Sequence, residues 1–108
     1  MTVSLPASIA TYFDALRHGD FERLGTCFTP GAIMHDEGEF HCGPEAIAAW
    51  LRATQEKASY RVELLDALRD GDRVTVATKV VGNFPGSPVQ LDQVFLLTDG
   101  LIQSLEIS

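Results

Sequence analysis

The stretch YFDALRHGDFERLGTCFTPGAIMHD, residues 12–36, decides the fold, because it predicts two helices and the strand that follows them. Apolar residues recur at helical spacing just before this stretch and in its first residues, which indicates an amphipathic helix. Gly19 fits the residue just past the end of this helix, and Asp20 can cap a second, short helix over residues 21–28. A Thr-Pro-Gly triplet then breaks the helical pattern, so residues 32–36 are predicted to form a strand.

The rest of the chain divides into one more helix and a run of strands. Gly43-Pro44 begins a third helix over residues 44–57, with an acidic residue in its first turn. After it the sequence becomes β-branched and alternating, with glycine-containing turns, which predicts strands over residues 59–70, 73–84, 89–98 and 101–108. Three helices followed by successive antiparallel strands indicate an α+β fold. The length of 108 residues predicts one domain, residues 1–108.

Composition and charge exclude several classes of partner. Eight basic and fifteen acidic residues give a net charge of −7, and no basic cluster occurs. We therefore expect no nucleic-acid partner, since such binding needs clustered Lys and Arg. No apolar run is long enough to span a bilayer, and the first residues do not resemble a signal peptide, so we expect a cytoplasmic protein without a membrane partner. The two cysteines, Cys27 and Cys42, are expected to be free thiols in that compartment.

The strand over residues 89–98 is apolar on both faces. One face carries Leu91, Gln93, Phe95 and Leu97, and the other carries Gln90, Asp92, Val94 and Leu96. A strand of this kind is covered on both sides. The three helices can cover one face, and we expect a second copy of the chain to cover the other, giving a homodimer packed through the sheet.

The order of these elements resembles the NTF2-like superfamily, in particular its SnoaL-like and ketosteroid isomerase-like enzymes. The resemblance is carried by residues 12–36, then by GPEAIAAWL at 43–51, then by an aspartate-bearing strand that ends in DGLI at 99–102. It implies a cone, in which a strongly curved sheet wraps around the helices and leaves an internal pocket open at one end. Most known members dimerise. The superfamily hosts isomerases, cyclases, dehydratases and transport adaptors, so the fold alone does not settle the function.

The resemblance also implies catalytic positions. Tyr12 precedes Gly19-Asp20 at the distance found in the isomerase-like members, Asp36 matches their catalytic aspartate, and Asp92 matches an aspartate that lies a few residues before a glycine turn. Each residue also has a structural interpretation. Tyr12 could be an amphipathic residue on the core side of its helix. Asp36 could bond to turn backbone. Asp92 could form a salt bridge on a neighbouring strand, to Lys79 or Arg73.

The resemblance implies the following chemistry. Asp36 would move a proton on a carbon next to a carbonyl, and Tyr12 with a neutral Asp92 would donate hydrogen bonds to the enolate oxygen. His35 is a rival base, but adjacent strand residues point to opposite faces, so His35 and Asp36 are not both expected inside. The substrate would be a small apolar carbonyl compound, bound without a cofactor by a pocket wall of Phe13, Phe28, Trp50, Val94 and Leu96.

Two alternatives compete with this interpretation. His35, Asp36, Glu39 and His41 offer nitrogen and oxygen ligands, but their spacing matches no established zinc pattern, so we expect no metal. The second alternative is a non-catalytic pocket protein that binds a small ligand or serves as an accessory subunit. If Asp92 forms a salt bridge on the outer face, this second alternative is favoured over the enzyme.

Overall fold

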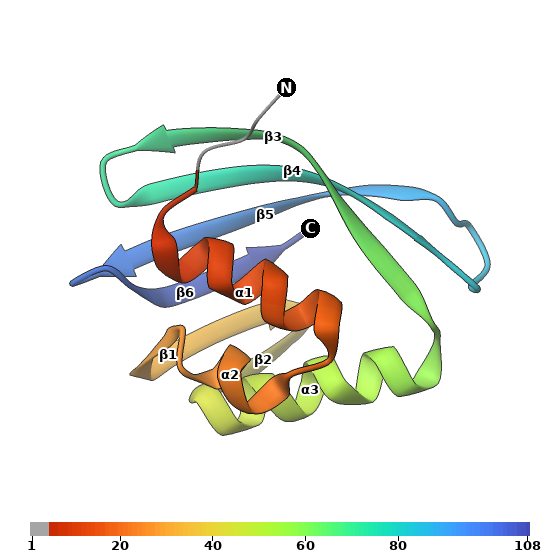
Figure 1. The fold of residues 1–108 in the computed structure, drawn as a ribbon, viewed down its shortest axis with the longest axis horizontal. Helices are drawn as coiled ribbons and strands as arrows, with labels where there is room; N and C mark the ends of the chain where they lie inside the picture. The colour runs from red at the N-terminus through yellow and green to blue at the C-terminus, as the bar shows by residue number, and fades with distance from the viewer. Residues whose placement is uncertain (1–4) are drawn as a thin grey trace.

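Three helices lie on one face of a six-stranded sheet that curves around them (Figure 1). The structure, a computed structural model, describes residues 5–108. The helices are α1 (Ala7–His18), α2 (Phe21–Gly25) and α3 (Pro44–Lys57). The strands are β1 (Phe28–Asp36), β2 (Glu39–Cys42), β3 (Tyr60–Asp70), β4 (Arg73–Gly82), β5 (Val89–Thr98) and β6 (Leu101–Ile107). The α+β class predicted from the sequence is confirmed.

The ends of the first two helices follow the local sequence, with one difference. Gly19 adopts a left-handed conformation, φ 68°, at the end of α1, and the Asp20 side chain accepts a hydrogen bond of 3.2 Å from the backbone N–H of Arg23. The second helix, however, ends at Gly25, and β1 already begins at Phe28 rather than at residue 32. Phe28 pairs with Ile102 of β6, so pairing within the sheet overrides the helical pattern of the local sequence.

The sheet has the strand order β2-β1-β6-β5-β4-β3. β1 runs parallel to β6, and the other neighbouring strands are antiparallel. The register shifts between Leu64 and Asp66 in the β3–β4 pair, and between Leu96 and Leu97 in the β5–β6 pair, where Gln103 of β6 is the extra residue. Irregularities of this kind increase the local twist and bend a strand. They fit the curvature seen in Figure 1, where β3 and β4 bend as they approach the end of α3.

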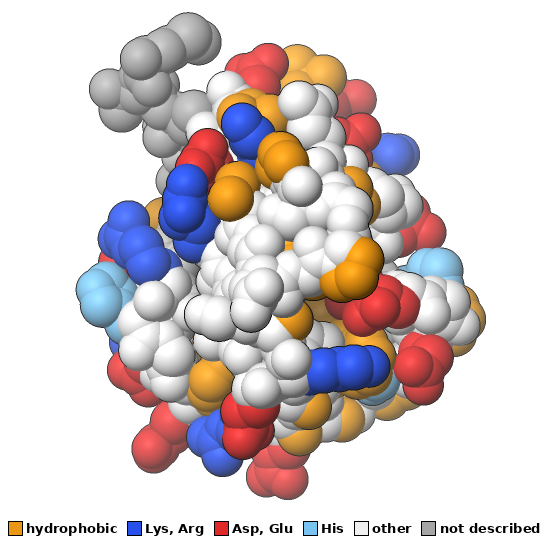
Figure 2. Space-filling view, turned by 90° about the vertical axis from the view of Figure 1, so that its right-hand side faces the viewer, with side chains coloured by type: hydrophobic (Ala, Val, Ile, Leu, Met, Phe, Trp, Pro, Cys, Tyr) orange, Lys and Arg blue, Asp and Glu red, His pale blue; other side chains and the backbone are white. Residues whose placement is uncertain are grey.

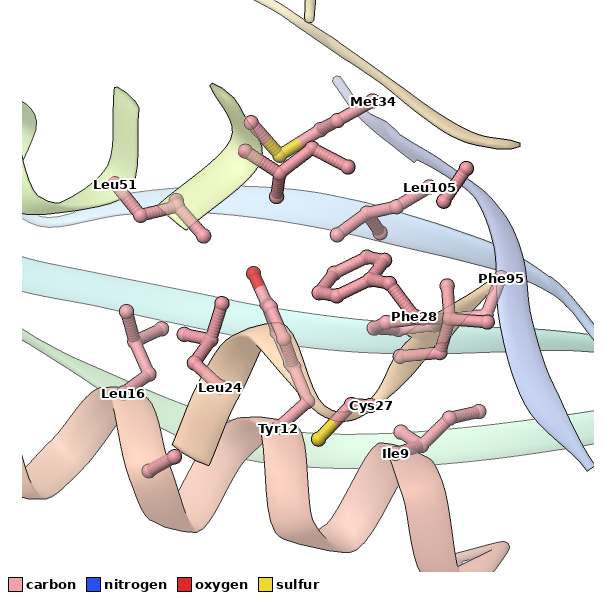
Figure 3. Packing of buried hydrophobic residues seen from close by; sticks show 14 of the residues in the cluster. Ile9, Tyr12, Leu16, Leu24, Cys27, Phe28, Met34, Leu51, Phe95 and Leu105 are labelled. Carbon is pink, nitrogen blue, oxygen red and sulfur yellow. The ribbon is translucent and has the colours of Figure 1, made fainter. Parts of the chain in front are cut away.

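The core lies between the helices and the concave face of the sheet, and aromatic rings make up its centre (Figure 3). The ring of Tyr12 meets Phe13, Phe28 and Phe95 edge to face, with centroid distances of 5.0, 5.9 and 5.6 Å. Edge-to-face pairs at such distances are favourable beyond the area that they bury. The ring of Tyr12 is therefore held in one orientation, and this orientation decides where its hydroxyl lies.

The two faces of β5 are unequal. Gln93, Phe95 and Leu97 are buried under the helices, whereas Asp92 and Leu96 are exposed on the convex face. The strand is thus partly apolar on both faces, as expected, and the helices cover the face that carries Gln93. Within residues 5–108, no helix has the length and apolar character needed to cross a membrane.

Candidate active site

A cavity of about 240 Å³ lies between α1, α3 and the concave face of the sheet. Its lining is mainly apolar, and a few polar groups converge on it, which is the usual composition of a small-molecule site. We call this cavity the inner pocket. It is lined by Tyr12, Leu16, Asp36, Glu37, Leu51, Thr54, Tyr60, Val62, Val80, Leu91, Gln93 and Ile107.

Tyr12 lines the inner pocket, and its hydroxyl is buried. The residue is 0% exposed, and its hydroxyl has no hydrogen-bond partner among residues 5–108. In Figure 3 the hydroxyl points away from α1, toward Leu51 and α3. Burial raises the pKa of Tyr12 far above its usual range, and Tyr60 and Asp36 nearby raise it further. The group therefore stays protonated and is a hydrogen-bond donor without an acceptor, which is rare in a buried position.

Asp36 lies at the end of β1, on the same face as the buried Met34, and its side chain lines the inner pocket. Its Oδ2 accepts a hydrogen bond of 3.1 Å from Nε1 of Trp50 on α3. The indole in turn stacks on His41 of β2, with ring centroids 4.4 Å apart. Because one carboxylate oxygen is held by the indole, the other is free to take part in proton transfer at the pocket.

Tyr60 closes the other side of the inner pocket. Its hydroxyl lies 3.0 Å from Oγ1 of Thr54, which itself donates to the backbone carbonyl of Leu51 over 2.9 Å. Since the Thr54 proton is used in that bond, the Tyr60 hydroxyl donates to Thr54. Burial raises the pKa of Tyr60, so it too remains neutral.

The late-strand polar residue of the inner pocket is Gln93, not Asp92. The prediction that Asp92 faces the pocket is wrong: its side chain is exposed on the convex face, and it forms no ion pair with Lys79 or Arg73 within the described chain. Gln93 is buried in its place, and its Oε1 has no hydrogen-bond partner among residues 5–108. A shift of one residue along a strand exchanges its faces, which explains the error.

His35 also lies outside the inner pocket, so the prediction of His35 as a rival pocket base is wrong. Its ring stacks on Phe40 of β2 at 4.4 Å and lies 3.5 Å from a carboxylate oxygen of Glu106, on the convex face. His41 pairs with Met34 and so points to the concave face. The two histidines therefore point to opposite faces. Among the described residues, no group of three or more His, Cys, Asp or Glu side chains is placed to hold a metal ion.

None of the five residues expected to form the pocket wall lines the inner pocket. Phe13 and Phe28 instead pack against the ring of Tyr12. Trp50 acts through its hydrogen bond to Asp36. Val94 and Leu96 lie on the convex face, because β5 turns Phe95 inward. Pocket walls are instead formed by aliphatic residues of α1, α3 and the strands.

The sequence prediction missed most residues that line the inner pocket, among them Gln93 and Tyr60. For Gln93, a signal existed: its face of β5 carries three apolar residues, whereas the face of Asp92 carries two. The more apolar face is the one expected under helices, and Gln93 is its polar member. Tyr60 shares strand parity with Val62, but no local pattern predicts that its hydroxyl reaches Thr54.

Comparison with known proteins supports this description of the fold. A solved protein from Sinorhizobium meliloti, called a "putative polyketide cyclase", is 44% identical over 96% of this chain and 95% of its own, with a TM-score of 0.93. A ketosteroid isomerase-like protein from Catenulispora acidiphila, in complex with trimethylamine, is 22% identical over 97% and 86% of the two chains, with a TM-score of 0.82.

A third solved structure, an NTF2-like protein of unknown function from Cytophaga hutchinsonii, is 15% identical over 100% of this chain and 91% of its own, with a TM-score of 0.80. This likeness and that to the Catenulispora protein establish the fold alone. No curated protein has a significant match to the sequence. The model of the SnoaL-like domain, however, matches residues 9–104. The chain therefore belongs to the SnoaL-like family and has the NTF2-like fold.

Proposed function

We propose that the protein is a cofactor-independent acid/base enzyme, an isomerase, cyclase or dehydratase, that acts on a small, mainly apolar carbonyl compound in the inner pocket. The observation that carries the proposal is the buried, unpartnered hydroxyl of Tyr12, a residue that lines the same pocket as Asp36. A buried donor without an acceptor costs stability, and a substrate carbonyl oxygen would supply the missing acceptor. Family membership adds support, and so does the cyclase name of the Sinorhizobium protein.

The mechanism assigns one role to each polar group. The free carboxylate oxygen of Asp36 takes a proton from the carbon next to the substrate carbonyl. The electron pair of that C–H bond becomes a C=C bond, and the π pair of the C=O bond moves onto the oxygen, which gives an enolate. Tyr12 donates a hydrogen bond to the resulting enolate oxygen. Asp36 then returns the proton to another carbon of the substrate. The bond from Trp50 holds the carboxylate in place throughout.

Gln93 takes over part of the role that the sequence assigned to Asp92. Gln93 lines the inner pocket, and its buried Oε1 has no partner among residues 5–108. Because an amide oxygen only accepts hydrogen bonds, the donor to the enolate oxygen would be the Nε2–H₂ end of this side chain. An amide N–H is a weaker proton donor than a neutral carboxylic acid. The proposed oxyanion site therefore rests on one strong donor, Tyr12, and one weaker donor, Gln93.

The test is turnover over a panel of enones and hydroxyacyl compounds, comparing the wild type with Asp36→Asn. Loss of the base is expected to lower kcat by at least about a hundredfold. Asp92→Asn is the matched control, because it makes the same chemical change on the convex face and should leave kcat unchanged. Equal turnover by the wild type and Asp36→Asn on every active substrate would remove Asp36 from the mechanism.

The second candidate function is a non-catalytic protein that binds the same class of ligand. It is favoured by one observation, the exposure of Asp92, which leaves the pocket with a single carboxylic acid from the predicted pair. Binding of a carbonyl ligand that depends on Tyr12, without turnover of any panel member, would support this function and contradict the enzyme.

A further inference from the structure

A second cavity, of about 680 Å³, adjoins the inner pocket at the end of the molecule where α3 ends and the β4–β5 loop lies. The two cavities share three lining residues, Glu37, Thr54 and Tyr60, so they adjoin at these side chains. We call the second cavity the outer compartment. Figure 2 views this end of the molecule and shows hydrophobic side chains inside a hollow bordered by charged ones. The other residues of the outer compartment are Glu39, Trp50, Ala53, Lys57, Ala58, Asn83, Phe84 and Pro85.

We propose that the outer compartment is a second ligand subsite, which receives a flat, uncharged, apolar tail of the compound whose carbonyl head lies in the inner pocket. This inference rests on the proposed function for the head and extends it to the tail. Volume supports it, because drug-sized ligands fill cavities of about 300–1,000 Å³. The inner pocket alone, at about 240 Å³, falls below that range.

Aromatic residues give the outer compartment its preference for a flat group. Trp50 and Phe84 are each half-buried, and both line it. The indole of Trp50 is fixed, because it stacks on His41 and its N–H is bonded to Asp36. A fixed ring loses little side-chain entropy when a ligand packs against it, so contact with a flat apolar group is favourable.

The charges of the outer compartment disfavour an anionic tail. Glu37 and Glu39 line it together with a single cation, Lys57, and all three side chains are exposed. This excess of carboxylates would repel an acidic group, while an uncharged tail meets no such penalty. Since these charges do not attract an uncharged tail, its contacts with the aromatic side chains are the main source of its affinity.

The β4–β5 loop is held in place at its root, which makes the outer compartment preformed. The backbone N–H of Asn83 donates to the carbonyl of Ser59 over 3.0 Å, and the N–H of Gly82 donates to Oγ of Ser87 over 2.9 Å. A Cβ at Gly82 would lie 2.6 Å from Cβ of Tyr60, so only glycine permits this approach. The loop that carries Phe84 is thereby anchored beside Tyr60, the residue at the junction of the two cavities.

The test compares the binding of two enones that share one head. Benzylideneacetone carries a phenyl tail, and ethylideneacetone carries a methyl group in its place. Trp50 is the single tryptophan of the chain, so its indole N–H signal in NMR titrations reports binding at the site. We expect Phe84→Ala to weaken benzylideneacetone binding by about tenfold and to leave the Kd of ethylideneacetone within about twofold. Phe40→Ala, on the convex face, is the matched control and should change neither Kd.

Further variants separate the subsite from the function of the head. Phe84→Leu, which keeps an apolar side chain in the loop, should lose less benzylideneacetone affinity than Phe84→Ala. Tyr12→Phe should weaken both enones equally. If Phe84→Ala changes both Kd values by the same factor or changes neither, or if the wild type binds neither enone, the subsite is overturned. Tail-dependent binding without turnover would keep the subsite and contradict the enzyme, whereas turnover without tail dependence would do the reverse.

Discussion

The buried hydroxyl of Tyr12 lowers the stability of the folded protein, and in the proposed function it gains a hydrogen-bond acceptor only when a ligand is bound. It is fully buried and has no partner within the described chain. Leaving a buried polar group unsatisfied costs about 1–3 kcal/mol. The three aromatic neighbours of the ring hold the hydroxyl in this position, so the side chain cannot turn to find an acceptor. Such a trade between stability and function is typical of active sites.

Tyr12→Phe is therefore expected to stabilise the protein and to impair its function. We expect the free energy of unfolding to rise by about 1 kcal/mol, because the variant no longer buries an unpaired hydroxyl. Ligand affinity or kcat should fall, since the carbonyl oxygen loses its donor. Urea denaturation and enone titration measure the two effects. Tyr60→Phe is the control, and it should be destabilised because it loses a bond to Thr54. A marked loss of stability in Tyr12→Phe would show that its hydroxyl is bonded in the folded state.

The two pocket tyrosines also predict how stability changes in alkali. Burial raises the pKa values of both Tyr12 and Tyr60 above the usual value of about 10. Above that pH the unfolded chain releases these protons while the folded chain keeps them, so the unfolded state binds fewer protons and stability falls as pH rises. Below about pH 10 both states are protonated, and the contribution is constant.

We expect the urea midpoint of the wild type to decline between about pH 9 and pH 11. In Tyr12→Phe the decline should be shallower, because one of the two raised groups is gone. Comparing the two proteins at each pH cancels the contribution of other titrating groups, such as Cys27, whose pKa burial also raises. Identical slopes in both proteins would contradict a buried, neutral Tyr12.

Among the elements, the contact between the end of β4 and the start of β3 is the tightest backbone approach near the site. Gly82 pairs with Tyr60, and an added Cβ would meet both the Ser59 carbonyl and the Tyr60 side chain. Backbone cannot move aside without displacing the strand. The position of Tyr60, and with it the junction of the two cavities, therefore depends on glycine at residue 82.

Gly82→Ala is expected to lower the free energy of unfolding by about 1–3 kcal/mol, as overpacking does, and to displace Tyr60. Urea denaturation measures the loss of stability. Gly31→Ala is the matched control: it also lies in a strand, its φ is not positive, and an added Cβ would meet nothing within 4 Å. Equal stabilities of the two variants would contradict the close contact.

For the molecule as a whole, the homodimer expected from the sequence stays a prediction. The convex face of the sheet exposes apolar side chains that a second copy would bury, including Phe40, which is 69% exposed, and Leu96, which is 45% exposed. These two residues line one shallow groove with Ile33, His35 and Val94. Contiguous apolar surface of this kind marks an interaction site in many proteins.

Leu96→Glu is expected to convert a dimer into a monomer, because two copies would bring buried carboxylates together at the interface. Light scattering at micromolar concentration measures the mass. Ala46→Glu is the control, since it adds the same charge at an exposed position of α3 and should leave the mass unchanged. A monomeric mass for the wild type would contradict the dimer itself.

Much of the fold could be predicted from local patterns. Gly19 and Asp20 mark the junction of the first two helices, and the alternation of apolar residues marks the long strands, because helix ends, turns and strand periodicity depend on neighbouring residues. The same patterns, with the family resemblance, placed Tyr12 and Asp36 correctly at the pocket. Tyr12 lies on a helix with a clear apolar face, whereas the strand pattern left open whether Asp36 or His35 faces inward, and the structure places Asp36 there.

The remaining features were decided by tertiary packing. The apolar pattern of β5 allowed either face to lie under the helices, and the packing of Phe95 against Tyr12 and Phe13 selected the face that carries Gln93. That choice moved Asp92, Val94 and Leu96 to the convex face. The bond from Trp50 to Asp36 and the place of Tyr60 between two cavities likewise join residues distant in the chain. Such contacts have no local signal, because they exist only once the sheet has curved around the helices.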